Sequence, residues 1–110
     1  MATPAHRLLV FSNPVEGRED EYNDWYDEVH IDEVLEVDGF VACQRFSADD
    51  GTEGAPARYL AVYEIDADDP VAAYDTLQAS VGDMNVTDAI DRSSIAAWIF
   101  TARGERIAVS

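Results

Sequence analysis

Cysteine, histidine and lysine are scarce in this sequence, and each shortage excludes a kind of site. Cys43 is the only cysteine, so the chain can form neither an internal disulfide nor a cysteine-based metal cluster. The two histidines, His6 and His30, are far apart in the sequence, which disfavours a dedicated transition-metal centre. We therefore predict that the protein holds no metal.

Long apolar segments are also missing. The longest unbroken apolar runs have only a few residues, whereas a membrane-spanning helix needs ~20. The N-terminal residues up to Arg7 lack the apolar segment that a signal peptide contains. The sequence therefore predicts a cytoplasmic protein with no membrane partner.

Positive charge is in short supply, because seven arginines and no lysine stand against 23 acidic residues, for a formal net charge of -16. Such a surface repels phosphate backbones and anionic lipids, so we expect no nucleic-acid partner and no polybasic membrane anchor. We interpret the acidity as a solvated surface, produced either by a GC-rich genome or by adaptation to salt. Gly-rich phosphate loops and the Gly-x-Ser-x-Gly motif of hydrolases are absent too.

What the chain does contain is a regular succession of strand and helix signals. Its 110 residues and 47% hydrophobic content suit one domain spanning residues 1–110, with no internal linker. Short apolar or alternating runs predict strands at residues 6–13, 40–47, 58–65 and 95–102. Apolar residues at helical spacing predict helices at residues 18–36 and 69–82, the second opened by Asp69-Pro70 and closed by Gly82. In residues 40–47, alternation places even-numbered residues on one sheet face and odd-numbered residues on the other.

This order, β-α-β-β-α-β, is typical of a ferredoxin-like α+β domain, which has one four-stranded antiparallel sheet with two helices on one face. The strands, however, are apolar on both faces; in the first, Leu8 and Val10 alternate with Leu9 and Phe11. An uncovered apolar sheet face is an interaction surface, and a second copy of the chain is the simplest partner. We therefore predict a homodimer in which two sheets close into an α+β barrel around a central lumen.

Residues 13–40 carry a motif that resembles a known family. Its parts are an Asn-Pro turn, a Trp-Tyr pair, a histidine four residues after that tyrosine, and Gly-Phe opening a strand: Asn13-Pro14, Trp25-Tyr26, His30 and Gly39-Phe40. The motif resembles the EthD-like branch of the dimeric α+β barrel superfamily, over about the first third of the chain. Position 38 is aspartate where such proteins often have proline. The superfamily includes small-molecule cyclases, lactone isomerases and monooxygenases, many of which use neither metal nor organic cofactor, so the resemblance implies that no cofactor is needed.

His30 and Tyr26 are the predicted catalytic residues. They are four apart on one predicted helix, so their side chains can meet. Asp27 and Glu33 can orient the imidazole and raise its basicity, which lets His30 exchange protons with a bound substrate near neutral pH. Tyr26 can donate a hydrogen bond to a carbonyl or enolate oxygen. The alternative is that His30 is a structural histidine at the boundary between helix and sheet.

Six further residues are candidates for substrate binding, and each also has a structural interpretation. Arginines within strands can bind an acidic substrate group or form ion pairs, an asparagine at a strand end can reach the lumen or shape a turn, and aromatic residues can line a pocket or fill the core. These candidates are Asn13, Trp25, Arg45, Arg58, Tyr63 and Trp98. His6 begins the first strand and can also face the lumen.

Two classes of function remain open from the sequence. The first is a cofactor-independent enzyme that acts on a small hydrophobic carbonyl-bearing metabolite, aromatic, polyketide-like or lactone-like. Acid/base proton transfer would produce cyclisation, isomerisation or dehydration, and an oxygen-using variant belongs to the same class. The second is a non-catalytic accessory protein of an oxidative catabolic pathway, binding a small molecule or a haem, with His30 or His6 as the only possible axial ligand.

Overall fold

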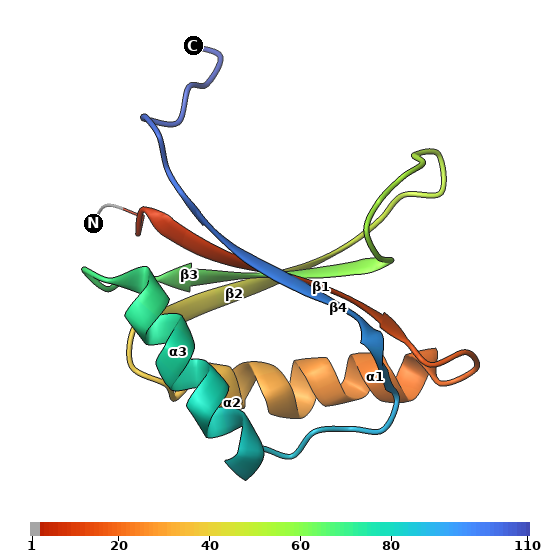
Figure 1. Cartoon of the computed structure of the whole chain (residues 1–110). Helices are drawn as coiled ribbons and strands as arrows, with labels where there is room; N and C mark the ends of the chain where they lie inside the picture. Colours follow the sequence, from red (N-terminus) through yellow and green to blue (C-terminus); the bar gives the residue numbers. More distant parts are fainter. Residues whose placement is uncertain (1–2) are drawn as a thin grey trace.

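Figure 1 shows a computed structural model of the chain, which describes residues 3–110. The strands are β1 (His6–Pro14), β2 (Phe40–Ser47), β3 (Tyr59–Ile65) and β4 (Ile90–Thr101). A long helix between β1 and β2 has three parts: α1 (Glu19–Trp25), a π-helical segment (Tyr26–His30) and α2 (Ile31–Leu35). Helix α3 (Pro70–Ser80) follows β3 and ends in a 3-10 turn (Val81–Asp83).

The four strands form one antiparallel sheet in the order β2-β3-β1-β4, and the helices lie on one face of it (Figure 1). The prediction of an α+β fold with a four-stranded antiparallel sheet is therefore confirmed. Helix α3 begins as expected, because the Asp69 side chain accepts a hydrogen bond from the backbone N–H of Ala72 at 3.0 Å and Pro70 takes the first helical position. At the other helix end, Gly39 adopts φ +96° and turns the chain into β2.

Strand β4 starts at Ile90, five residues before the predicted start at residue 95. The first part of β4 is mostly polar, so alternation of apolar residues does not predict it as a strand. The pairing of β1 with β4 is irregular between Phe11 and Asn13, and there the Asn13 backbone N–H donates to the hydroxyl of Ser94 at 2.7 Å. A bulge of this kind lets a polar segment belong to a sheet strand.

The expected alternation in β2 is wrong. The register between β2 and β3 shifts between Phe40 and Ala42, and an extra residue at such a point reverses which face the preceding side chains occupy. Phe40 therefore packs toward the helices, where it is 3% exposed and lies edge-on to Tyr63. Phe46 lies on the opposite face, where it is 46% exposed.

The core fills the space between the inner face of the sheet and the helices. It contains Leu8, Tyr22, Trp25, Tyr26, Val34, Phe40, Ala61, Tyr63, Ile65, Ala73, Leu77, Ala89 and Ile90. The outer face carries exposed Trp98, Phe100 and Phe46. Residues 102–110 do not cover it, because they are exposed throughout and lead away from the sheet (Figure 1). Within residues 3–110, the outer face is therefore apolar and uncovered.

Candidate functional site

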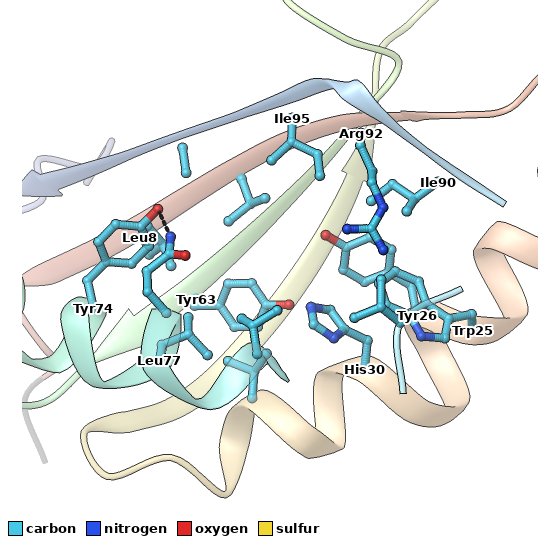
Figure 2. A pocket seen from close by; sticks show the side chains of 16 residues that line it. Leu8, Trp25, Tyr26, His30, Tyr63, Tyr74, Leu77, Ile90, Arg92 and Ile95 are labelled. Carbon is cyan, nitrogen blue, oxygen red and sulfur yellow. Dashed lines mark hydrogen bonds between the residues drawn. The ribbon is translucent and has the colours of Figure 1, made fainter. Parts of the chain in front are cut away.

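A pocket of about 200 Å³ lies between the inner face of the sheet, the long helix, α3 and the beginning of β4 (Figure 2). Apolar side chains make most of its wall. Polar groups enter it from four elements: His30 and Tyr26 from the π-helical segment, Tyr63 from β3, Tyr74 and Gln78 from α3, and Arg92 from β4. The pocket is thus a small apolar chamber with few polar groups, which is the usual composition of a small-molecule site.

The π-helical segment determines how His30 meets its neighbours. The backbone N–H of Ile31 bonds to the carbonyl of Tyr26, five residues back. In an α-helix each residue turns by about 100°, so residues five apart point about 140° away from each other. The wider turn instead stacks His30 on Trp25, with ring centroids 4.4 Å apart and planes 16° apart, and sets it edge-on to Tyr26 at 5.3 Å. Such π turns occur frequently at functional sites.

The His30 ring presents one buried and one free nitrogen. Its Nδ1 is buried and faces Glu33 Oε1 at 3.8 Å, a separation too long for a hydrogen bond. Its Nε2 has no hydrogen-bond partner among residues 3–110. Unlike Nδ1, this nitrogen is not fully buried, so a ligand can reach it. Burial lowers the pKa of His30, while the carboxylate of Glu33 acts in the opposite direction. The imidazole is therefore held neutral, with Nε2 available as a base.

Asn85 fixes the surroundings of His30 from the loop before β4. Its backbone N–H and side-chain amide both donate to Glu33 Oε2, at 2.9 and 3.3 Å. Its carbonyl accepts a hydrogen bond from Trp25 Nε1 at 2.5 Å. Asn85 therefore holds both neighbours of His30: the Trp25 ring stacked on it and the Glu33 carboxylate beside it. Sequence reasoning missed Asn85, because nothing in the local pattern connects this polar loop to the helix.

Tyr63 supplies a second polar group to the pocket. It is 1% exposed, and its hydroxyl has no hydrogen-bond partner within the described part of the chain. In Figure 2 that hydroxyl points toward the ring of His30. Its cross-strand neighbour Cys43 offers only a weakly bonding thiol, whose pKa burial raises to about 11. Burial also raises the pKa of Tyr63, so its hydroxyl stays protonated and can donate.

Tyr26 also lines the pocket, but other protein groups surround it. It is 2% exposed, and the guanidinium of Arg45 lies 4.5 Å from its ring centroid. Burial and the neighbouring Tyr22 raise the pKa of Tyr26, and the Ser12 hydroxyl and Arg45 act against that rise. Tyr26 is therefore a neutral wall residue beside His30.

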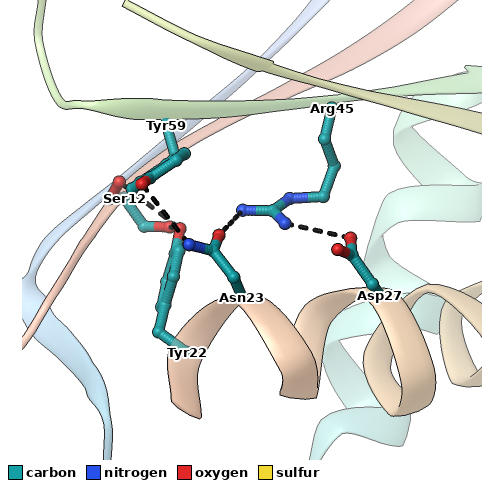
Figure 3. A network of polar contacts seen from close by, with 6 residues as sticks. All are labelled: Ser12, Tyr22, Asn23, Asp27, Arg45 and Tyr59. Atoms are coloured by element: carbon teal, nitrogen blue, oxygen red, sulfur yellow. Dashed lines mark hydrogen bonds and ion pairs between the residues drawn. The ribbon is translucent and has the colours of Figure 1, made fainter. Parts of the chain in front are cut away.

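Arg45 does not line the pocket, and its guanidinium is bound by other side chains of the protein (Figure 3). It donates to Asp27 Oδ1 at 3.0 Å and to Asn23 Oδ1 at 2.8 Å. Asn23 in turn donates to the hydroxyl of Tyr59. The structure thus places Arg45 in a network that joins the sheet to α1, as the structural alternative expects.

Three other predicted substrate-binding residues lie away from the pocket. Asn13 accepts a hydrogen bond from the backbone N–H of Arg58 at 2.7 Å, and the Arg58 side chain pairs with Glu19 at 2.5 Å. Trp98 is 50% exposed on the outer face of the sheet. His6 is also outside the pocket, where its Nδ1 contacts the hydroxyl of Thr101 at 2.8 Å.

The expected position of the site needs a correction. The predicted lumen lies between the outer faces of two sheets, whereas His30 and Tyr26 project from the helical layer on the inner face. The sheet itself separates them from the outer face. The chamber that contains them therefore lies inside a single chain, and only Tyr26, His30, Trp25 and Tyr63 of the predicted site residues are brought together there.

No protein-family model, curated protein or solved structure matches this chain. Among residues 3–110, no three histidine, cysteine or acidic side chains are grouped so that they could hold a metal ion. In the same range no helix has the length and apolar character to cross a membrane. The pocket itself is therefore the feature of this chain that indicates a function.

Proposed function

We propose that this pocket binds one small hydrophobic molecule bearing a carbonyl group and that His30 moves a proton at the carbon next to it, without metal or organic cofactor. The observation that carries the proposal is the presence, in one apolar chamber, of an imidazole with a free Nε2 and a buried tyrosine hydroxyl with no partner. A base and a hydrogen-bond donor are the two groups that enolisation requires.

The proposed step uses only groups of this chain. Nε2 of His30 takes a proton from the carbon adjacent to the carbonyl, and the electron pair of that C–H bond passes to the carbonyl oxygen. The hydroxyl of Tyr63 donates to the oxygen as it gains charge, which is the role that the sequence had suggested for Tyr26. The imidazolium then returns the proton to another carbon in an isomerisation or to a departing hydroxyl in a dehydration. In a cyclisation the enolate carbon first attacks a second carbonyl of the same substrate, and the proton goes to the oxygen of that carbonyl.

The size of the chamber limits the substrate. An apolar cavity of ~150 Å³ accommodates benzene. A volume of about 200 Å³ therefore suits one ring with small substituents, or a compact lactone. Larger polycyclic substrates would have to extend through the mouth beside Arg92 and Ile95.

We also propose that the domain is ferredoxin-like, belongs with the EthD-like proteins and forms a homodimer through its outer sheet face. The strand order β2-β3-β1-β4 with all helices on one face supports the first part. The exposure of Phe46, Trp98 and Phe100 on the opposite face supports the homodimer. In such a dimer each chain would keep its own chamber.

Proton exchange provides a test that does not require the natural substrate. A small aromatic ketone with acidic α-protons, 2-indanone, is incubated with the protein in D2O, and the loss of its α-proton signal is followed by NMR. We expect acceleration by the native protein, and a fall of about 100-fold in rate for His30→Gln and for Tyr63→Phe. His6→Gln, which changes the histidine outside the pocket, should keep the native rate.

Exchange that continues unchanged in His30→Gln would reject the proposed base. A non-catalytic binding role is the second candidate, and the 3.8 Å between His30 Nδ1 and Glu33 favours it, because no hydrogen bond fixes the ring. Binding of 2-indanone with no acceleration of exchange in the native protein would support that role instead.

A further inference from the structure

Arg92 is the one cation that lines the pocket. It lies in the first, polar part of β4, where the strand lies beside α1, the first part of the long helix (Figure 1). Figure 2 shows its side chain extending from β4 toward the side of the chamber formed by Tyr26 and Trp25. The residue is exposed, so it stands at the mouth rather than in the interior.

Arg92 is also unpaired. Within residues 3–110, its guanidinium makes no ion pair and no side-chain hydrogen bond, whereas Arg18, Arg45 and Arg58 each pair with a carboxylate. Arg103 and Arg106 are unpaired as well, but they lie in the exposed C-terminal tail. The chain has a net charge of -16, yet Arg92 has no acidic partner within residues 3–110. This arginine at the mouth of an apolar chamber is therefore free to bind an acidic ligand.

We propose that the ligand of this pocket is an acid: a small ring compound with a carboxylate that Arg92 binds at the mouth while the ring fills the chamber. The proposal rests on the proposed function for the location of the site, and it adds the substrate class. A guanidinium matches a carboxylate with two parallel hydrogen bonds, which fixes the orientation of the ligand as well as its charge. The end opposite the carboxylate then lies toward Tyr63 and His30.

The surrounding charge strengthens this selection. Because the surface is strongly acidic, an anion is repelled everywhere except where a free arginine offsets the field. Neutral ring compounds can enter the chamber through apolar contacts alone, so the preference for an acid over its neutral analogue measures the contribution of Arg92 directly.

The test compares benzoate with benzamide, which has the same shape without the charge. Affinities are measured by ligand-observed NMR titration, which suits weak binding. For the native protein we expect benzoate to bind about fivefold more tightly than benzamide. Arg92→Gln should abolish this preference by weakening benzoate binding, and Arg92→Lys should keep part of it. Arg103→Gln removes the same charge from the tail and should leave the preference intact.

Several results would overturn the proposal: equal affinity for the two probes in the native protein, a preference that survives Arg92→Gln, or a preference that Arg103→Gln removes equally. Failure of both probes to bind at millimolar concentration would reject the pocket as a site for a ring acid. The readout involves no catalysis. An acid preference without proton exchange would reject only the proposed reaction, and exchange of a neutral ketone without acid preference would reject only the role of Arg92.

Discussion

At the scale of single residues, burial sets the protonation state of His30, and the consequence can be measured as stability. Because burial lowers the pKa of His30 below its ordinary value of 6.5, the unfolded chain binds a proton more readily than the folded one. The free energy of unfolding should therefore fall as the pH drops below 6.5 and continue to fall until the folded-state pKa is passed. Urea denaturation above and below pH 6.5 measures this slope.

A matched pair of variants isolates the contribution of this histidine. His30→Gln should flatten the slope just below pH 6.5, whereas His6→Gln, on the exposed strand end, should leave it unchanged. The titratable and charged groups around the His30 ring are Glu33 and Tyr26 on its own helix, Tyr63 on β3 and Arg92 on β4. An identical slope in native protein and His30→Gln would mean that burial does not hold the imidazole neutral.

Residue-scale reasoning from the sequence reached part of the site. Spacing along one helix was enough to predict that Tyr26 and His30 meet, and the rings do lie 5.3 Å apart. It could not identify Tyr63 as the donor without a partner, because whether a hydroxyl finds a hydrogen-bond partner depends on every neighbour across the sheet. It also could not single out Arg92, whose importance comes from the absence of an acidic partner.

At the scale of elements, the helices and strands followed from periodicity, but the irregular positions did not. The π turn and the shift between Phe40 and Ala42 each add one residue to a regular element, and the irregularity opposite Phe11 and Asn13 adds three to β4. A search for regular spacing cannot place such an addition. The apolar stripe of the long helix does contain a gap of five, from Val29 to Val34, which marks the extra residue in hindsight.

The π turn yields an element-scale prediction. Deleting the exposed residue Glu28 removes one residue from the segment, which should convert it to an ordinary α-helix. Helix content by circular dichroism should be kept, but Trp25 and His30 should no longer stack, and exchange of 2-indanone should fall to the rate of His30→Gln. Glu28→Ala keeps the length and should retain the native rate. Native exchange in the deletion variant would show that the π turn is dispensable.

The cap of α3 provides a prediction about stability. Asp69→Ala removes the acceptor for the N–H of Ala72 and should lower the free energy of unfolding by about 1 kcal/mol. Urea denaturation measures the loss. Asp68→Ala removes the same charge from the neighbouring residue, whose side chain caps nothing, and should cost clearly less. Equal losses in the two variants would attribute the effect to charge rather than to the cap.

At the scale of the whole molecule, the uncovered outer face predicts association of two copies. Trp98 is 50% and Phe100 58% exposed there, and the tail leads away from them. Sedimentation at micromolar concentration should give a dimer for the native protein and a monomer for Trp98→Glu. Val71→Glu, which places a charge on an equally exposed apolar residue of α3, should remain dimeric.

Charge makes this association distinctive. Two copies that each carry a net charge of -16 repel each other, and salt screens that repulsion while leaving apolar contact unaffected or stronger. The dissociation constant should therefore decrease as salt is added, the opposite of an interface held by ion pairs. A native protein that sediments as a monomer at both low and high salt would show that the exposed Trp98 and Phe100 serve some purpose other than pairing with their own copies, and would leave the chamber of each chain as an independent site.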